Sequence, residues 1–224
     1  MELWLDTINF DVIKKATQQL SITGVTTNPT ILSKANKSCD ETIRHLLDAQ
    51  PGLLAVQVTS SDENVMLEQA HRLRALSDRI IVKVPVFQGG LHVIRQLALE
   101  SIPTMATAIF ETSQIYLSIL SGAQYAAPYL GRIEKMNESS NTIQDMLNAI
   151  KMHNSPLKII AASIKSKAQV LNCLLSGVQA ITLPELAYFD LITDNSFTME
   201  CIDDFRTDWN DSQLCANSTF LNNL

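Results

Sequence analysis

The chain has 224 residues, of which 46% are hydrophobic, and a formal net charge of -6. This length and composition suit one large domain with a sizeable core, and the negative charge argues against a protein that binds nucleic acid or anionic membranes. No apolar run reaches the roughly 18 residues of a transmembrane helix. The acidic first residues, "MELWLDTINF", do not predict a signal peptide.

Short apolar segments, each followed by a longer amphipathic one, organise the chain. Because short runs rich in β-branched residues are typical of buried strands, these segments predict eight β-strands. In chain order they are Glu2–Asp6, Gly24–Pro29, Leu53–Thr59, Ile80–Val86, Thr104–Phe110, Tyr125–Leu130, Lys158–Ile164 and Ala180–Glu185.

The segments between these strands predict helices. Asn64–Leu76, Thr112–Leu120 and Thr142–Ile150 have apolar residues at helical spacing. Ser166 and Gly177 are residue types that begin and end helices, so they predict the limits of a helix after the seventh strand.

Alternating strands and helices predict parallel strands joined by right-handed crossovers. With eight such units we expect an α/β fold, a (β/α)8 TIM barrel. The alternative is an open, doubly wound sheet, but no strand is followed by a Gly-rich dinucleotide or phosphate loop. Residues 1–224 are expected to form a single barrel domain with an extra C-terminal helical tail at about 195–224. In this tail one side of a helix carries Met199, Ile202, Phe205 and Trp209.

The cysteines bear on metal binding and on the cellular compartment. Cys39, Cys173, Cys201 and Cys215 show no CxxC or Cys/His spacing typical of a zinc site. We therefore expect reduced thiols in a cytoplasmic protein without a metal site.

Lys83 is the most unusual residue of the predicted strands. It lies in the middle of "RIIVKVPVF", Arg79–Phe87, a mostly aliphatic segment. Burial of an unpaired ammonium group is costly, so a lysine there needs a partner or a function. Burial and nearby cations lower the pKa of a lysine, which yields a neutral amine that attacks carbonyl groups. The product is an iminium, an electron sink that permits cleavage of a neighbouring C–C bond.

Other polar residues lie within or directly after the predicted strands, where a barrel carries its active site. A carboxylate can balance the iminium charge or transfer protons, hydroxyl and amide groups can position a catalytic water, and cations can hold a phosphate. The candidate site consists of Asp6, Thr26, Asn28, Gln57, Lys83, Thr107, Tyr129, Arg132, Ser163 and Lys165.

Each of these residues also has a purely structural interpretation. In that interpretation Lys83 and Asp6 form a buried ion pair, and Asp6 or Thr7 caps the following helix. Residues 26–29, "TTNP", form a turn. Tyr129 is a core tyrosine whose hydroxyl has a hydrogen-bond partner, and Arg132 and Lys165 lie on a solvent-exposed rim.

Seven segments resemble, in order, the motifs of the transaldolase family. They are "MELWLDT", "GVTTNPTIL", "IIVKVPV", "ATAIFETSQ", "GAQYAAPYLGRI", "IIAASIKS" and "ITLPELAY". The resemblance extends to about Tyr188. It is strongest to the short branch of the family, which includes fructose-6-phosphate aldolases and short bacterial transaldolases.

The resemblance implies a (β/α)8 barrel that needs no cofactor and uses Lys83 as its Schiff-base lysine. It implies small-molecule sugar phosphates as substrates. It also implies a homo-oligomer, a pentamer or decamer, in which the C-terminal helix packs on a neighbouring subunit. The implied roles are acid/base catalysis for Asp6, substrate contact for Asn28, a share in the water site for Thr107, and phosphate contact for Arg132, Ser163 and Lys165.

Two positions separate activities within the family that the chain resembles. Transaldolases carry Glu and Phe where this chain has Gln57 and Tyr129, whereas fructose-6-phosphate aldolases carry Gln and Tyr. We therefore expect a class I aldolase that reversibly cleaves fructose 6-phosphate, or a similar ketose phosphate, to dihydroxyacetone and glyceraldehyde 3-phosphate. The alternatives are a transaldolase that transfers the dihydroxyacetone unit, and a non-catalytic barrel that binds sugar phosphates.

The sequence departs from the family pattern after the fourth strand. Relatives usually read Thr-x-Glu-Gly there, whereas this chain reads "FQGG", Phe87–Gly90. The bulky Phe87 is expected near the mouth of the site, and Gly89 stands where an acidic residue is usual.

Overall fold

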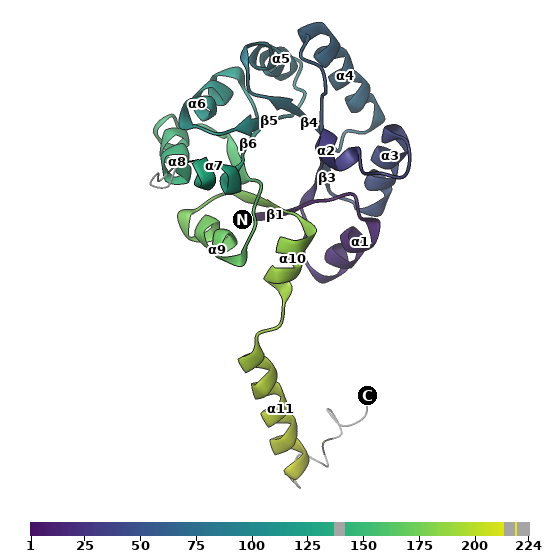
Figure 1. Ribbon diagram of the computed structural model, residues 1–224, viewed down its shortest axis with the longest axis vertical. Coiled ribbons are helices and arrows are strands. Elements are labelled where there is room, and N and C mark those ends of the chain that lie inside the picture. Colours follow the sequence, from purple (N-terminus) through teal and green to yellow (C-terminus); the bar gives the residue numbers. More distant parts are fainter. Residues whose placement is uncertain (137–141, 213–217, 219–224) are drawn as a thin grey trace. The chain divides into compact units, whose positions relative to one another are not determined.

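The structure is a computed structural model that describes residues 1–136, 142–212 and 218. The chain divides into two compact units, Met1–Leu191 and Ile192–Leu224. In the first unit eight parallel strands close into a barrel in the order of the sequence, which confirms the predicted TIM barrel (Figure 1). The strands are β1 (Glu2–Asp6), β2 (Gly24–Thr26), β3 (Leu53–Gln57), β4 (Ile80–Pro85), β5 (Thr104–Ile109), β6 (Tyr125–Pro128), β7 (Lys158–Ala161) and β8 (Ala180–Leu183).

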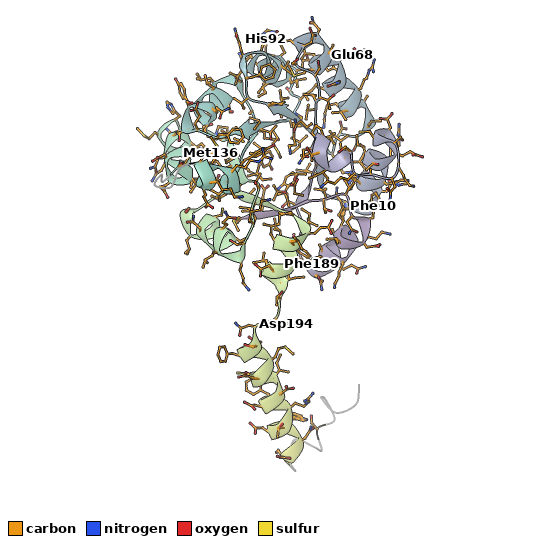
Figure 2. All side chains as sticks on the ribbon, viewed as in Figure 1. Phe10, Glu68, His92, Met136, Phe189 and Asp194 are labelled. Atoms are coloured by element: carbon orange, nitrogen blue, oxygen red, sulfur yellow. The ribbon has the colours of Figure 1, made fainter. Side chains whose placement is uncertain are left out.

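Helices follow the strands and form the outer ring of the barrel (Figure 1). Polar side chains such as Glu68 and His92 lie on their outer surface (Figure 2). The helices of this unit are α1 (Phe10–Gln19), α2 (Pro29–Leu32), α3 (Cys39–Ala49), α4 (Glu63–Leu76), α5 (Gln88–Leu99), α6 (Thr112–Ser121), α7 (Leu130–Met136), α8 (Thr142–Met152), α9 (Lys167–Ser176) and α10 (Glu185–Ile192).

Several strands end earlier than the sequence predicts, and for β2 the reason is a capping residue that starts the next helix. β2 stops at Thr26, and the side chain of Asn28 caps α2 by accepting a 2.9 Å hydrogen bond from the backbone N–H of Ile31. Proline at the first helical position then continues the turn. The predicted limits of α9 are confirmed: the side chain of Ser166 caps its start, and Gly177 ends it with a φ of 82°.

The start of α1 differs from the structural alternative considered for Asp6 and Thr7. Asn9 is the N-cap, and its side-chain oxygen accepts hydrogen bonds from the backbone N–H groups of Asp11 and Val12 at 3.2 and 3.4 Å. Asp6 is the last residue of β1, three residues earlier. Its carboxylate is therefore not engaged in helix capping.

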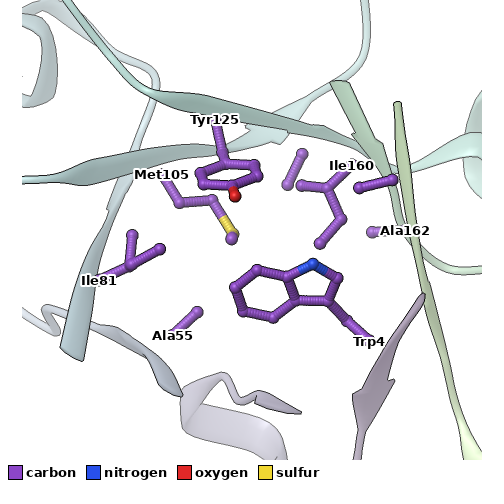
Figure 3. Packing of buried hydrophobic residues seen from close by; sticks show 9 residues of the cluster. Trp4, Ala55, Ile81, Met105, Tyr125, Ile160 and Ala162 are labelled. Carbon is purple, nitrogen blue, oxygen red and sulfur yellow. The ribbon is translucent and has the colours of Figure 1, made fainter. Parts of the chain in front are cut away.

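The interior of the barrel is layered, because alternate residues of each strand point inward. One layer is apolar and centres on the indole of Trp4, which is completely buried (Figure 3). Tyr125 meets Trp4 edge to face, with ring centroids 5.6 Å apart. This layer also contains Ala55, Ile81, Met105, Ala127, Ile160, Ala162 and Ala180.

A polar cluster lies at the amino-terminal ends of the strands. Glu2 pairs with Lys158 at 2.6 Å and accepts hydrogen bonds from the side chains of Trp4 and Tyr125 at 3.1 Å each. Burial raises the pKa of Glu2, but the hydrogen bonds from Lys158, Trp4 and Tyr125 and the positive charge of Lys158 together outweigh burial, so the pKa of Glu2 is lowered overall. This cluster connects β1, β6 and β7 at the end of the barrel opposite the carboxyl-terminal ends of the strands.

The second unit contains α11 (Ser196–Asp211), which Asn195 caps. Its large apolar side chains are exposed to different degrees: Phe197 by 72%, Met199 by 43%, Ile202 by 48% and Phe205 by 69%. This helix falls within the helical tail that the sequence predicts. None of the described helices is long and apolar enough to cross a membrane.

Candidate active site

A cavity of about 930 Å³ opens at the carboxyl-terminal ends of the strands. Its walls include every predicted site residue except Thr107: Asp6, Thr26, Asn28, Gln57, Lys83, Tyr129, Arg132, Ser163 and Lys165. Strand periodicity explains why they meet. Lys83 lies two residues beyond Ile81, and Asp6 two residues beyond Trp4, so both point inward one layer above the apolar interior. A core strand can therefore carry a lysine because that position faces the cavity.

Lys83 is 4% exposed, and its ammonium group donates a 2.7 Å hydrogen bond to the main-chain carbonyl oxygen of Thr27. Burial lowers the pKa of Lys83, and the negative charge of Asp6 opposes this shift without cancelling it. Among the described residues no ion pair joins Lys83 to Asp6. The amine therefore lies in the cavity wall with its charged form disfavoured.

Asp6 receives its hydrogen bond from a neighbouring strand. The hydroxyl of Thr26 donates to Asp6 Oδ1 at 2.7 Å. Parallel pairing of β1 with β2 sets Asp6 directly opposite Thr26. Thr27, which follows, turns the other way and donates its hydroxyl to the carbonyl oxygen of Ala55 at 2.9 Å. The carboxylate is thus oriented by the strand register.

Thr107 lies behind the cavity wall. It is completely buried, and its hydroxyl donates a long hydrogen bond of 3.4 Å to the phenol oxygen of Tyr129. The pairing of β5 with β6 shifts register between Ala106 and Ile109, and Ala108 has a φ of 57°. Such bulges redirect side chains near active sites. Here the irregular backbone adjoins the residue that contacts Tyr129.

Gln57, the last residue of β3, is paired in register with Lys83 on β4. The side-chain oxygen of Gln57 is buried and has no hydrogen-bond partner among the described residues. An unpaired buried amide oxygen is costly in free energy, and such groups are commonly satisfied by a ligand or an ordered water. Gln57 is therefore available to hold a polar group inside the cavity.

The cationic part of the cavity comes from the ends of β6 and β7. The guanidinium carbon of Arg132 lies 5.0 Å from the ring centroid of Tyr129, a cation–π distance. Arg132 and Lys165 are exposed, but both line the cavity. Ser163, which also lines the cavity, has a φ of 61°, a strained backbone for a residue other than glycine.

Gly131 permits this close approach of the two strand ends. A Cβ atom at Gly131 would lie 2.2 Å from the carbonyl oxygen of Ser163, which real contacts do not allow. The glycine therefore lets the first turn of α7 pack directly on Ser163, two residues beyond the end of β7.

Some cavity residues were not predicted from the sequence. Thr182 of β8 and Glu185 of α10 both line the cavity, and Glu185 accepts hydrogen bonds from the side chains of Thr7 at 2.6 Å and Asn9 at 3.2 Å. Thr182 carried a usable signal, since it is a polar residue inside the apolar strand "AITL". Phe87, expected near the mouth of the site, is not among the described residues that line the cavity, because its ring packs over Gly89 and Gly90.

Comparisons with known proteins identify relatives of this chain. The family model described as Transaldolase/Fructose-6-phosphate aldolase matches residues 3–217. A protein from Streptococcus pneumoniae (strain ATCC 700669 / Spain 23F-1), named a probable fructose-6-phosphate aldolase, is 41% identical over 220 residues, which cover 93% of this chain and 96% of that protein. The chain therefore belongs to the transaldolase/fructose-6-phosphate aldolase family of enzymes.

Proposed function

We propose that the protein is a class I aldolase that reversibly cleaves fructose 6-phosphate, or a similar ketose phosphate, to dihydroxyacetone and glyceraldehyde 3-phosphate. The observation that carries the proposal is a buried lysine with a lowered pKa in the wall of a polar cavity. The name of the Streptococcus pneumoniae relative supports the same reaction. Lys83 acts as the nucleophile, because a neutral amine adds to a ketone carbonyl.

The proposed reaction begins with attack of the Lys83 amine on C2 of the ketose. Loss of water from the carbinolamine gives an iminium. Asp6 then removes the proton of the C4 hydroxyl, the C3–C4 bond breaks, and its electron pair moves into the iminium to form an enamine. Glyceraldehyde 3-phosphate leaves as the aldehyde. This use of Asp6 fits its location in the same cavity wall as Lys83.

The second half of the reaction releases dihydroxyacetone. The enamine carbon takes a proton, and water hydrolyses the resulting iminium to free the amine. Tyr129 supplies this proton, directly or through a water that Gln57 and Thr107 help to hold. The long Thr107–Tyr129 hydrogen bond and the unpaired oxygen of Gln57 support this assignment. Asn28 contributes its amide N–H groups to the substrate, because its oxygen already caps α2.

The phosphate of the substrate is assigned to Arg132, Ser163 and Lys165. A guanidinium group can bind two phosphate oxygens at once, and a lysine adds a second positive charge. All three residues line the same cavity as Lys83. They therefore suit the phosphate-bearing end of a substrate whose carbonyl reaches Lys83.

The protein is further proposed to be a homo-oligomer, a pentamer or a decamer. The exposed apolar residues of α11, among them Phe197 and Phe205, support this because a partner surface would remove them from water. Size-exclusion chromatography with light scattering measures the assembly. A monomer at micromolar concentration would contradict this part of the proposal.

The activity is tested with purified protein and fructose 6-phosphate, with and without erythrose 4-phosphate as an acceptor. The expected result is free dihydroxyacetone and glyceraldehyde 3-phosphate in equal amounts without the acceptor. Sedoheptulose 7-phosphate as almost the only new product would identify a transaldolase instead. No product under either condition would leave a barrel that only binds sugar phosphates.

A further inference from the structure

Thr182 joins the site through a chain of hydroxyl groups. Its Oγ1 lies 2.7 Å from Thr26 Oγ1, and Thr26 Oγ1 lies 2.7 Å from Asp6 Oδ1. Both threonines are almost completely buried, at 3% and 1% exposed. They come from β8 and β2, which pair with β1 on its two sides. Closure of the barrel therefore brings three strands together around one carboxylate.

The donor-to-acceptor direction of these two hydrogen bonds follows from the number of hydroxyl hydrogens available. An ionised carboxylate only accepts hydrogen bonds, and a threonine hydroxyl has one hydrogen to donate. When Asp6 is ionised, the hydrogen of Thr26 is used on Asp6, so Thr26 must accept from Thr182. Thr182 is then the terminal donor. Hydrogen bonds in such chains strengthen one another, because each donor is polarised by the bond that it accepts.

We propose that Thr182 is a positioning residue that acts through Thr26 to hold the Asp6 carboxylate in the orientation needed for proton transfer. The inference rests on the proposed function, because it assigns Asp6 the removal of the C4 hydroxyl proton. Thr182 also lines the cavity, so a direct contact with the substrate is the competing explanation. The two explanations predict different effects on kcat and KM.

The test compares Thr182→Val with Thr182→Ser. Valine keeps the branched shape and removes the hydroxyl, whereas serine keeps the hydroxyl and removes the methyl group. Thr182→Val is expected to lower kcat about 3- to 10-fold, the size of one lost hydrogen bond, with little change in KM for fructose 6-phosphate. The kcat of Thr182→Ser is expected to remain within about twofold of the kcat of the parent protein. A role in packing predicts the opposite order of the two variants.

Thr26→Val provides the second arm. Because Thr182 acts through Thr26, the double variant Thr26→Val/Thr182→Val is expected to have the same kcat as Thr26→Val alone. If the Thr182→Val loss persists at full size in the Thr26→Val background, or if Thr182→Val raises KM alone, the inference is wrong. The thermal unfolding temperature of each variant, including Thr182→Ser, is compared with that of the parent protein. A variant that unfolds at the parent temperature but has a lower kcat has a kinetic defect and not a folding defect.

The parent protein distinguishes failure of this inference from failure of the proposed function. If the parent cleaves fructose 6-phosphate and Thr182→Val matches it in kcat, only the inference fails. If the parent neither cleaves the substrate nor forms a covalent adduct with dihydroxyacetone and borohydride, the reaction is wrong and the role of Thr182 is overturned with it.

Discussion

The Lys83 ammonium group donates a 2.7 Å hydrogen bond to the main-chain carbonyl oxygen of Thr27. This contact connects β4 to the residue directly after β2 and satisfies one hydrogen of a buried amine. The iminium formed on Lys83 would keep one N–H, and the carbonyl of Thr27 is the acceptor already next to it. The same contact thus orients the amine before the reaction and suits the iminium after it.

Borohydride together with dihydroxyacetone should trap a covalent adduct on the peptide that contains Lys83, because reduction converts the iminium to a stable secondary amine. Mass spectrometry of the digested protein locates the adduct. Lys83→Met should give no adduct, whereas Lys165→Met, which removes a lysine from the same cavity, should still give one. An adduct on Lys158 or Lys165 in the parent protein would assign the chemistry to another amine.

The rate of adduct formation should depend on pH in a way that reflects the lowered pKa of Lys83. Only the neutral amine attacks a carbonyl, so the trapping rate rises with pH as Lys83 loses its proton. Because burial lowers the pKa of Lys83, the rate should level off below pH 10.5, the ordinary value. A rate that still rises through pH 10.5 would contradict the assignment.

The stability of Lys83→Met should differ from that of the parent in a pH-dependent manner. Between the lowered pKa of folded Lys83 and the ordinary value of 10.5, the unfolded chain binds more protons than the folded chain. The free energy of unfolding of the parent therefore rises with pH across this window. Methionine has no such proton, so this rise should be missing from the variant. Urea unfolding at several pH values and one protein concentration measures the difference.

Arg132→Ala should weaken the binding of phosphorylated substrates. Loss of charged hydrogen bonds to a phosphate should raise KM for glyceraldehyde 3-phosphate in the synthetic direction about 10- to 100-fold. Unphosphorylated glyceraldehyde should change much less. Lys167→Ala is the matched control, because Lys167 is an exposed cation of α9 that does not line the cavity. Equal losses on both aldehydes would make Arg132 structural.

Tyr129→Phe should slow release of dihydroxyacetone more than C–C bond cleavage. Removal of a positioned proton donor is expected to lower aldolase turnover about 100-fold. The enamine then survives longer, so Gln57→Glu combined with Tyr129→Phe should raise the ratio of transfer to release. The ratio of sedoheptulose 7-phosphate to free dihydroxyacetone, formed from fructose 6-phosphate and erythrose 4-phosphate, measures this effect. An unchanged ratio in the double variant would remove these residues from the choice between the reactions.

Gly131→Ala should disturb the phosphate region selectively. The added Cβ would collide with the carbonyl oxygen of Ser163 at 2.2 Å, so the first turn of α7 must move and carry Arg132 with it. KM for phosphorylated substrates should rise. Gly177→Ala is the control: its φ of 82° strains an alanine by about 1 kcal/mol, but among the described residues no atom outside its own stretch of chain lies within 4 Å of the new Cβ. The free energy of unfolding of Gly177→Ala should fall without a change in KM.

The sequence by itself predicted the order of the strands, the barrel, and most of the residues that line the cavity. Apolar strands alternate with amphipathic segments, and polar residues such as Lys83 and Gln57 interrupt otherwise apolar strands. In a parallel barrel the carboxyl-terminal ends of all strands lie on one face, so residues distant in sequence share a cavity without any knowledge of their distances. This is why Asp6, Lys83 and Tyr129 could be assigned to one site from local pattern alone.

Only the tertiary structure decided which partners these residues have. Asn9 caps α1 in place of Asp6 or Thr7, and Thr107 is buried with its hydroxyl on Tyr129, next to the irregular backbone at Ala108. The hydroxyl chain from Thr182 to Asp6 needs β8 and β2 on the two sides of β1, which arises only when the barrel closes and the strand register is set. The alternation of residues along one strand predicts which side chains face inward, but it does not specify which inward side chains of neighbouring strands come into contact.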